Sequence, residues 1–282
     1  MSKLPSVVLL FLLILQSPTS ADDSNPLFAF CMDTHDSQKR SLMEQAEMLH
    51  DLGFDGAGHL WLDNLKERIE TLDEFDLRLF QVYLRVSLDL EGDPYDPRLE
   101  ESLPLLKDRD VMLALLLTGL PPSDPNGDSR AVEIVRKIAD MASEFGVRVV
   151  LYPHYGDWME KVENSVRIAK KVDRPNVGAM FNLSHWLKVD SEENLERMLT
   201  EAAPHLFAVS LNGADHAAEI QSGAGNFVQP LGEGSFDVRR LLDCLDNLGY
   251  QGPIGLQCWG IEGDAHEHLS RSMKVWREWH KE

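Results

Sequence analysis

The chain has 282 residues, of which 27 are basic and 47 are acidic, giving a formal net charge of −20. An acidic surface repels nucleic acids and anionic membranes, which excludes both as expected partners. The three cysteines, Cys31, Cys244 and Cys258, form no CxxC pair, which excludes a disulfide scaffold or a zinc ribbon. We expect three buried thiols. A Cys31–Cys258 disulfide on neighbouring strands stays as the alternative.

The first 21 residues have the pattern of a secretory signal peptide. Lys3 gives a positive start, residues 7–15 are uninterruptedly apolar, and Thr19 and Ala21 suit a signal peptidase site. A retained membrane anchor is the alternative, but this run is shorter than the roughly 20 residues that span a bilayer. We therefore expect an exported protein, periplasmic or extracellular, with a mature domain over residues 22–282 that no longer contacts the membrane.

From residue 27 onward, short apolar runs alternate with longer amphipathic stretches. The apolar runs have the length of buried strands and begin at Leu27, Phe54, Leu79, Val111, Val147, Val177, Leu206 and Pro253. Helical patterns cover residues 37–52, 64–75, 97–109, 129–145, 157–172, 191–203, 237–248 and 264–279. Ser, Asp or Asn marks many helix starts and glycine marks many ends, as capping requires.

Eight strand–helix alternations predict a parallel sheet with right-handed crossovers. Closing that sheet gives a single-domain (β/α)8 TIM barrel and leaves no exposed edge. A doubly wound open sheet is the alternative, but it usually has a glycine-rich phosphate turn after the first strand, and residues 32–36 are Met-Asp-Thr-His-Asp. The long connection from Gly213 to Gly234 is a candidate mobile loop.

In a closed barrel, the functional residues lie at the carboxyl ends of the strands. Four of the ten histidines, His35, His59, His154 and His185, fall just past predicted strand ends. Histidine is a proton carrier or metal ligand near neutral pH. Tryptophans at positions 61, 186 and 259 lie at the same end, where flat rings either stack on sugars or fill the mouth.

Three motifs carry a family resemblance. Residues 181–185 (FNLSH) are similar to F-D-x-x-H, residues 231–237 (LGEGSFD) to G-x-G-x-(I/F)-D, and residues 248–257 (LGYQGPIGLQ) to G-Y-x-G-x-(I/L)-x-x-E. On these motifs the chain, over about residues 27–280, resembles a divergent member of the xylose-isomerase-like TIM-barrel superfamily. That superfamily includes sugar phosphate isomerases and epimerases, inosose dehydratases and endonuclease IV.

The resemblance also implies a metal site, from which this sequence departs. Relatives hold a divalent metal with Glu, Asp, His and Glu after strands five to eight, and the two glutamates move protons. The corresponding residues here are Tyr152, Asn182, Asn212 and Gln257; only the additional histidine, His185, is kept. Amides are neutral and weak ligands for hard cations. We expect no tight Mg²⁺ or Mn²⁺ site; histidines holding a softer metal such as Zn²⁺ stay as an alternative.

Two functions stay open at this point. In the first, the barrel is a sugar isomerase, epimerase or lyase for a small carbohydrate, keto-sugar or polyol, with His154 and His185 as catalytic residues. The expected substrate-binding residues are His35, His59, Trp61, Tyr83, Asn182, Asn212, Gln257 and Trp259. In the second, an inactive barrel binds a sugar or a protein partner. A DNA-repair role is disfavoured by the acidic charge and the export signal.

Overall fold

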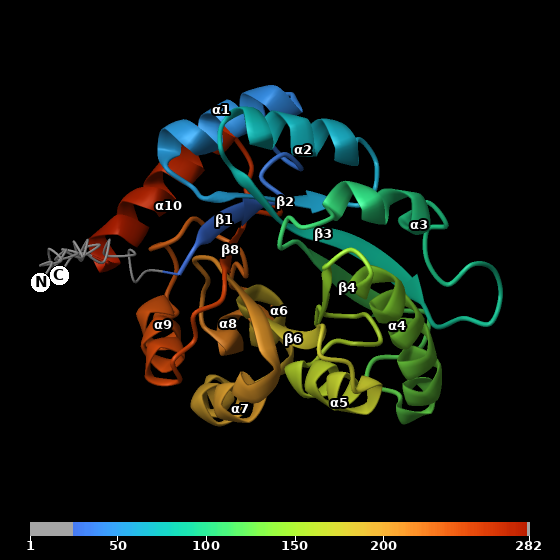
Figure 1. Cartoon of the computed structure of the whole chain (residues 1–282). Helices are drawn as coiled ribbons and strands as arrows, with labels where there is room; N and C mark the ends of the chain where they lie inside the picture. Colours follow the sequence, from blue (N-terminus) through green and yellow to red (C-terminus); the bar gives the residue numbers. More distant parts are fainter. Residues whose placement is uncertain (1–24, 281–282) are drawn as a thin grey trace, which may run out of the picture.

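A computed structural model of the chain describes residues 25–280, so the predicted signal peptide, residues 1–21, lies outside the described residues. Eight parallel strands close into a barrel in chain order (Figure 1). They are β1 (Leu27–Phe30), β2 (Gly56–Leu60), β3 (Arg78–Ser87), β4 (Met112–Thr118), β5 (Arg148–Leu151), β6 (Val177–Asn182), β7 (Leu206–Leu211) and β8 (Ile254–Gln257). β1 pairs with β8, placing Leu27 opposite Ile254. The predicted TIM barrel is confirmed, and the open-sheet alternative is wrong.

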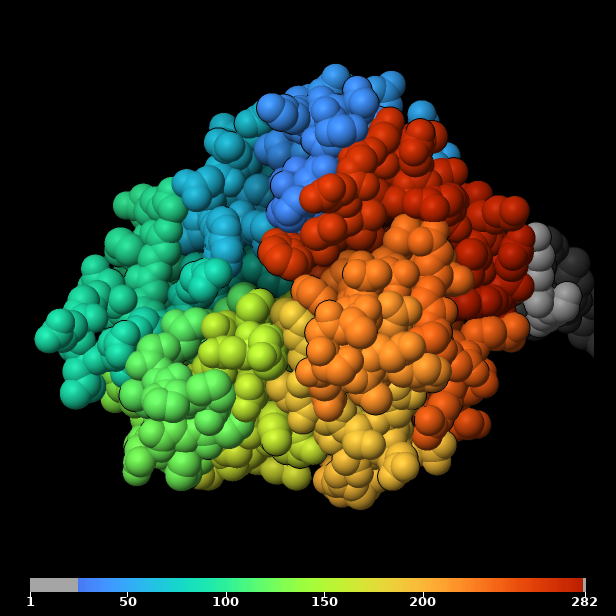
Figure 2. Space-filling view, turned by 180° about the vertical axis from the view of Figure 1, so that it is seen from behind, coloured from blue at the N-terminus to red at the C-terminus, as the bar shows by residue number. Residues whose placement is uncertain are grey.

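Helices surround the barrel. They are α1 (Leu42–Leu52), α2 (Leu65–Glu74), α3 (Leu99–Ser102), α4 (Asp128–Ser143), α5 (Val162–Val172), α6 (Leu183–Val189), α7 (Leu195–Ala202), α8 (Ala217–Gln221), α9 (Val238–Asn247) and α10 (Ala265–Trp279). The blue α1 and the red α10 lie side by side in both views (Figures 1 and 2). Within residues 25–280, no helix combines the length and apolarity needed to cross a membrane.

Helices α1 and α5 start five residues later than the sequence predicted, and α7 starts four residues later. α1 begins at Leu42 because the Ser41 side chain accepts a bond from the Glu44 amide, and Glu44 bonds back to Ser41, which fixes the helix start. α5 begins at Val162 because residues 157–161 form an irregular segment in which Trp158 and Met159 are buried. The short helices α6 and α8 were not predicted, since each is too brief to show a helical period.

Alternation along the strands divides the apolar side chains into two layers. On β4, Met112, Ala114 and Leu116 belong to the cluster inside the barrel, whereas the residues between them pack against the helices. The interior is filled by aromatic rings: Phe28 stacks on Phe80 with 4.9 Å between ring centroids. This filling closes the barrel below, so the space inside the described barrel opens toward the carboxyl ends of the strands.

The connection over residues 213–234 has internal structure. Gly213 and Gln229 exchange two backbone hydrogen bonds of 2.9 and 2.7 Å, which ties the two arms of the connection together. A Cβ at Gly213 would lie 2.1 Å from the Pro230 carbonyl oxygen, so only glycine permits this approach. The orange segment that contains this connection covers much of the face in Figure 2. The expected mobility of the loop stays a prediction.

Candidate functional site

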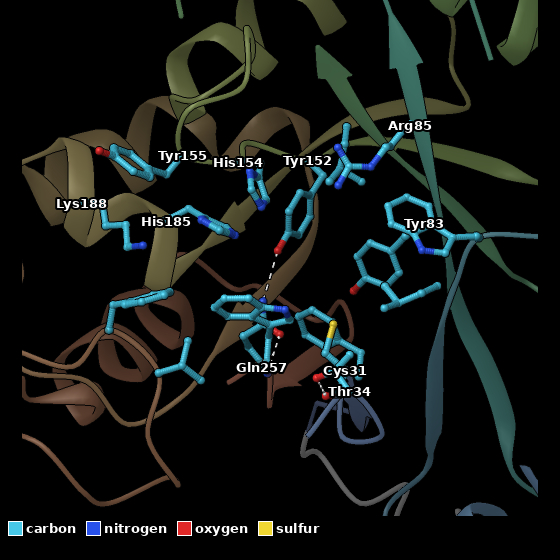
Figure 3. Close-up of a pocket in the computed structure, with 17 residues that line it drawn as sticks. Cys31, Thr34, Tyr83, Arg85, Tyr152, His154, Tyr155, His185, Lys188 and Gln257 are labelled. Carbon is cyan, nitrogen blue, oxygen red and sulfur yellow. Dashed lines mark hydrogen bonds between the residues drawn. The ribbon is translucent and has the colours of Figure 1, made fainter. Parts of the chain in front are cut away.

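A cavity of about 410 Å³ opens at the carboxyl ends of the strands (Figure 3). It is lined by residues from most of the barrel: Phe30, Cys31, Thr34, Leu60, Trp61, Tyr83, Arg85, Leu116, Tyr152, His154, Tyr155, His185, Lys188, Phe227, Val228, Gln257 and Trp259. Of the site residues predicted from the sequence, the cavity brings together Trp61, Tyr83, His154, His185, Gln257 and Trp259, with Tyr152 from the positions that the resemblance matches to metal ligands. It does not include His35, His59, Asn182 or Asn212.

His154 and His185 lie against each other on one side of this cavity. Their ring centroids are 4.0 Å apart, with His154 following β5 and His185 in the first turn of α6 (Figure 3). Burial, and then the neighbouring His154, holds the pKa of His185 well below its usual range. His185 is therefore neutral at pH 7. Its buried Nδ1 has no hydrogen-bond partner among the described residues.

The carboxylate of Asp157 lies next to His154. Oδ2 of Asp157 lies 3.3 Å from Nδ1 of His154, although neither atom makes a well-directed hydrogen bond within the described part of the chain. Burial lowers the pKa of His154 and raises the pKa of the Asp157 carboxyl. With Nδ1 turned to Asp157, Nε2 is the nitrogen of His154 that remains for a ligand. The sequence analysis missed Asp157, whose only signal is its place three residues after His154.

Asn182 lies beneath the cavity floor, and both polar atoms of its amide are hydrogen-bonded to neighbouring residues. Its Nδ2 donates to the hydroxyls of Tyr152 and Ser210, both at 2.7 Å. Its Oδ1 accepts from the Ser184 hydroxyl at 2.7 Å and from the His185 amide at 3.1 Å, which caps α6. This amide fixes both the floor and the start of the helix that carries His185.

The other three residues that the resemblance matches to metal ligands, Tyr152, Asn212 and Gln257, are also neutral and hydrogen-bonded. Burial raises the pKa of Tyr152, which keeps its proton. The Gln257 amide donates to the Tyr152 hydroxyl at 3.4 Å. Asn212 donates to the carbonyl of Phe227 at 2.8 Å, so it positions a cavity wall, and its Oδ1 has no partner in the described residues. Within residues 25–280, no group of three or more His, Cys, Asp and Glu side chains is arranged to hold a metal ion.

His35, in the loop after β1, and His59, in β2, are held by backbone atoms outside the cavity. His59 is buried, and its Nε2 donates to the Asp63 carbonyl at 2.7 Å while its Nδ1 faces the Arg68 guanidinium at 3.4 Å. His35 is exposed, and its Nδ1 accepts from the Gly260 amide at 3.2 Å. Both rings therefore organise loops, and neither is presented to the space where a ligand fits.

The side of the cavity across from the histidines carries rings and a cation. The guanidinium of Arg85, on β3, lies 5.0 Å from the Trp61 ring centroid. Tyr83 donates its hydroxyl to Gln81 at 2.7 Å, and burial raises its pKa, so it stays protonated. On the histidine side, sequence reasoning missed Tyr155, Lys188 and Phe227, because an aromatic or a lysine in a loop has no periodic signal.

Comparisons with known proteins identify the family of the barrel. Residues 46–279 match the family described as xylose isomerase-like TIM barrel. A ketose 3-epimerase from Arthrobacter globiformis is 22% identical over 170 residues, which are 59% of this chain and 54% of that protein, so the match spans about half of the relative.

Two solved structures share the fold. The D-allulose 3-epimerase from Methylomonas sp. is 16% identical, with a TM-score of 0.71 over 90% of this chain and 98% of that one. The 3-keto-D-glucoside 4-epimerase from E. coli is 15% identical, with a TM-score of 0.71 over 90% and 100% of the two chains. The allulose epimerase was also solved with D-allulose bound.

Proposed function

Because the chain belongs to the xylose isomerase-like TIM-barrel family, we propose that it is a carbohydrate isomerase whose proton carriers are His154 and His185. The observation that carries the proposal is the histidine pair at the mouth of the barrel, backed by Asp157. Histidine is the side chain whose ordinary pKa, about 6.5, suits proton transfer near neutral pH.

The placement of the two rings favours isomerisation over epimerisation. Inverting one carbon requires an acid or base on each face of the substrate. Both histidines stand on the same side, and the pKa values of Tyr83, Tyr152 and Cys31 are raised by burial, which makes their deprotonated forms scarce. A proton taken and returned on one face moves between adjacent carbons, which converts an aldose and a ketose into each other.

The proposed reaction moves one proton between adjacent carbons through an enediolate. Nε2 of His154 takes the proton from the carbon beside the carbonyl, and the electron pair moves onto the carbonyl oxygen to give an enediolate. Neutral His185 has one donor and one acceptor nitrogen, and it carries the hydroxyl proton from one oxygen to the other. His154 then returns its proton to the neighbouring carbon. Arg85 places a fixed positive charge on the cavity wall, where it stabilises the enediolate oxygen.

We propose that no divalent metal takes part. The positions that hold a metal in relatives are here a protonated phenol and amides, and the Asn182 oxygen already accepts two hydrogen bonds. This donor set does not fit Mg²⁺ or Mn²⁺, which bind charged oxygens. Elemental analysis after dialysis is expected to find far less than one metal ion per chain. About one Mn²⁺ or Mg²⁺ per chain would contradict the proposal.

The substrate class follows from the cavity and from the relatives. A volume of about 410 Å³ suits a monosaccharide, and the rings of Trp61 and Trp259 offer flat apolar surfaces for its C–H faces. The similar proteins are named for ketoses, D-allulose and a keto-glucoside, which supports a keto-sugar or its aldose isomer.

The proposal is tested by isotope exchange in D₂O. Purified protein treated with EDTA is incubated with a panel of aldoses, ketoses and sugar acids, and deuterium beside the carbonyl is followed by NMR. We expect exchange with retention of configuration on at least one sugar. Loss of exchange after EDTA, restored by Mn²⁺, would contradict the metal-free reaction. Sugar binding without any exchange would instead support the inactive-barrel alternative.

We also propose that the protein is exported, on the strength of the apolar run over residues 7–15 and the small residues before Asp22. Expression of the full chain in a secreting host, followed by N-terminal sequencing, is expected to give Asp22 as the first residue of the mature protein. An N-terminus that keeps residues 7–15 would contradict cleavage and support a retained anchor.

A further inference from the structure

The charge of the cavity is opposite to that of the chain. The protein carries a net charge of −20, yet no Asp or Glu is among the cavity-lining residues that the structure describes. Two cations, Arg85 and Lys188, do line it. In a protein with this excess of carboxylates, such a reversal creates a local positive potential where the ligand enters.

Lys188 is the cavity cation whose surroundings indicate the charge of the ligand. It lies in the last turn of α6 and is half-buried, with its amine 3.2 Å from the centroid of the Phe227 ring and 5.0 Å from that of Tyr155. Aromatic faces attract an ammonium by roughly 0.5 to 2 kcal/mol but do not neutralise it. Burial lowers the pKa of Lys188, in keeping with the loss of water around its amine.

The carboxylates nearest in sequence are occupied by other groups. Asp190 accepts bonds from Trp186, the Ser191 amide and Asn194. Glu192 accepts from the ring of His216 and from the Ala217 amide. Among the residues that the structure describes, Lys188 has no ion pair, although its helix is followed at once by acidic residues. Its charge is therefore left for a group that enters the cavity.

Several cations elsewhere on the barrel form ion pairs. Arg78 and Arg148 share Asp110, and Arg167 and Lys171 share Asp128, at distances of 2.5 to 3.0 Å. These pairs lie on the outside of the barrel, where water already screens charge. Lys188 differs from these pairs because it lies in the cavity, where water screens charge less, and has no ion pair among the described residues.

The two cavity cations lie on opposite sides of the histidine pair. In Figure 3, Lys188 lies beyond His185, whereas Arg85 lies on the far side of His154 and Tyr152. The charge of Arg85 lowers the pKa of both His154 and Asp157, so Arg85 belongs to the part of the cavity that holds the histidine pair. Lys188 lies toward the rim, beside the half-exposed ring of Tyr155. A substrate that spans the histidines reaches Lys188 with its far end.

We propose that the substrate is an anionic sugar, carrying a carboxylate or a phosphate group that binds the ammonium of Lys188. The inference rests on the proposed function for the reacting end of the molecule, and it adds the chemistry of the other end. The ammonium offers three donors to the anion, and the Phe227 and Tyr155 rings hold the amine in place. The positive cavity also draws an anion through the surrounding negative surface.

The test compares matched charged and neutral probes on the mature protein. D-glucuronate is paired with D-glucose, and D-fructose 6-phosphate with D-fructose, in calorimetric titrations. We expect one anionic probe to bind about tenfold or more tightly than its neutral partner, as a charged hydrogen bond allows. The affinity is expected to fall as salt rises from 0.05 to 0.5 M, because screening shortens the range of the attraction. The probe that binds identifies the anion.

Variants locate the effect. Lys188→Gln is expected to lose about tenfold or more in affinity for the anionic probe and to leave that of the neutral sugar within about twofold. Lys170→Gln, an exposed lysine on α5, is the matched control and is expected to bind as the wild type does. Circular dichroism of both variants checks that each is folded. Equal effects of the two substitutions would overturn the proposal.

The outcomes separate this inference from the proposed function. A neutral sugar that is isomerised as well as its anionic partner keeps the isomerase and overturns the anion site. An anionic sugar that binds through Lys188 without hydrogen exchange keeps the anion site and overturns the isomerase. If neither anionic probe binds, the anion site is overturned.

Discussion

Two pairs of histidines lie toward the same end of the barrel: His154 and His185 follow β5 and β6, whereas His35 follows β1 and His59 lies in β2. His35 and His59 are bound to the backbone at Gly260 and Asp63. After β5 and β6, the Nδ1 atoms of His154 and His185 have no hydrogen-bond partner in the described residues, and both rings line the cavity. A polar residue at a strand end is therefore a candidate for chemistry only when its polar atoms are not already used by the fold.

The largest expected effect comes from substitutions of His154 and His185. His154→Gln and His185→Gln are each expected to lower kcat by about a hundredfold or more, since a positioned proton carrier contributes roughly 10² to 10⁴ in rate. The same change at His35 is expected to alter kcat by less than about threefold, because its ring does not line the cavity. Hydrogen exchange measured on the three variants checks the contrast. Equal losses of kcat at His35 and His154 would contradict the different roles of the two histidines.

The fall of kcat/KM at acid pH tests whether Asp157 acts on His154. His154 must be neutral to act as a base, and burial lowers its pKa, so kcat/KM is expected to fall only below pH about 6.5. The Asp157 charge raises the pKa of His154 against that burial. Asp157→Asn is therefore expected to move the acid limb to lower pH and to lower kcat by about tenfold, since the ring loses its orienting partner. A limb that does not move, measured from pH 5 to 8, would contradict the pairing.

A smaller effect, on stability alone, is expected from substitutions of His59 and His35. His59→Ala removes the bond to the Asp63 carbonyl and the ring that faces buried Arg68, so it is expected to lower the free energy of unfolding by about 1 to 3 kcal/mol. His35→Ala, at an exposed ring, is expected to change it by less than about 0.5 kcal/mol. Urea unfolding followed by circular dichroism measures both. A larger loss at His35 than at His59 would reverse the assignment.

The fold was predictable because its signals are local and repeated. Each apolar run became a strand within a few residues of its predicted start, as Val177 did for β6, since a strand buried on both faces needs consecutive apolar residues. The helices that were missed, α6 and α8, have seven and five residues. Pieces this short show no period and depend on caps, such as the Asn182 side chain, that only the folded chain brings into place.

The site was predictable only in part, for a different reason. Position past a strand end placed His154, His185 and Gln257 correctly at one cavity. It did not show that Asn182 points into the floor, because the direction of a side chain depends on the hydroxyls of Tyr152 and Ser210, which lie 30 and 28 residues away. Lys188 is recognised as a cavity residue by its contact with the Phe227 ring. The two residues are separated in the sequence by β7, so no local pattern predicts this contact.

The hydrogen bond from the His185 amide to the Asn182 oxygen has a consequence for how this barrel changes chemistry. A helix start requires an oxygen acceptor, and an aspartate or an asparagine supplies one equally well. The position can therefore gain or lose a negative charge in a single substitution while the backbone that presents His185 and Lys188 keeps its course. The charge at this position and the course of the backbone are therefore independent of each other, so the charge can change without refolding.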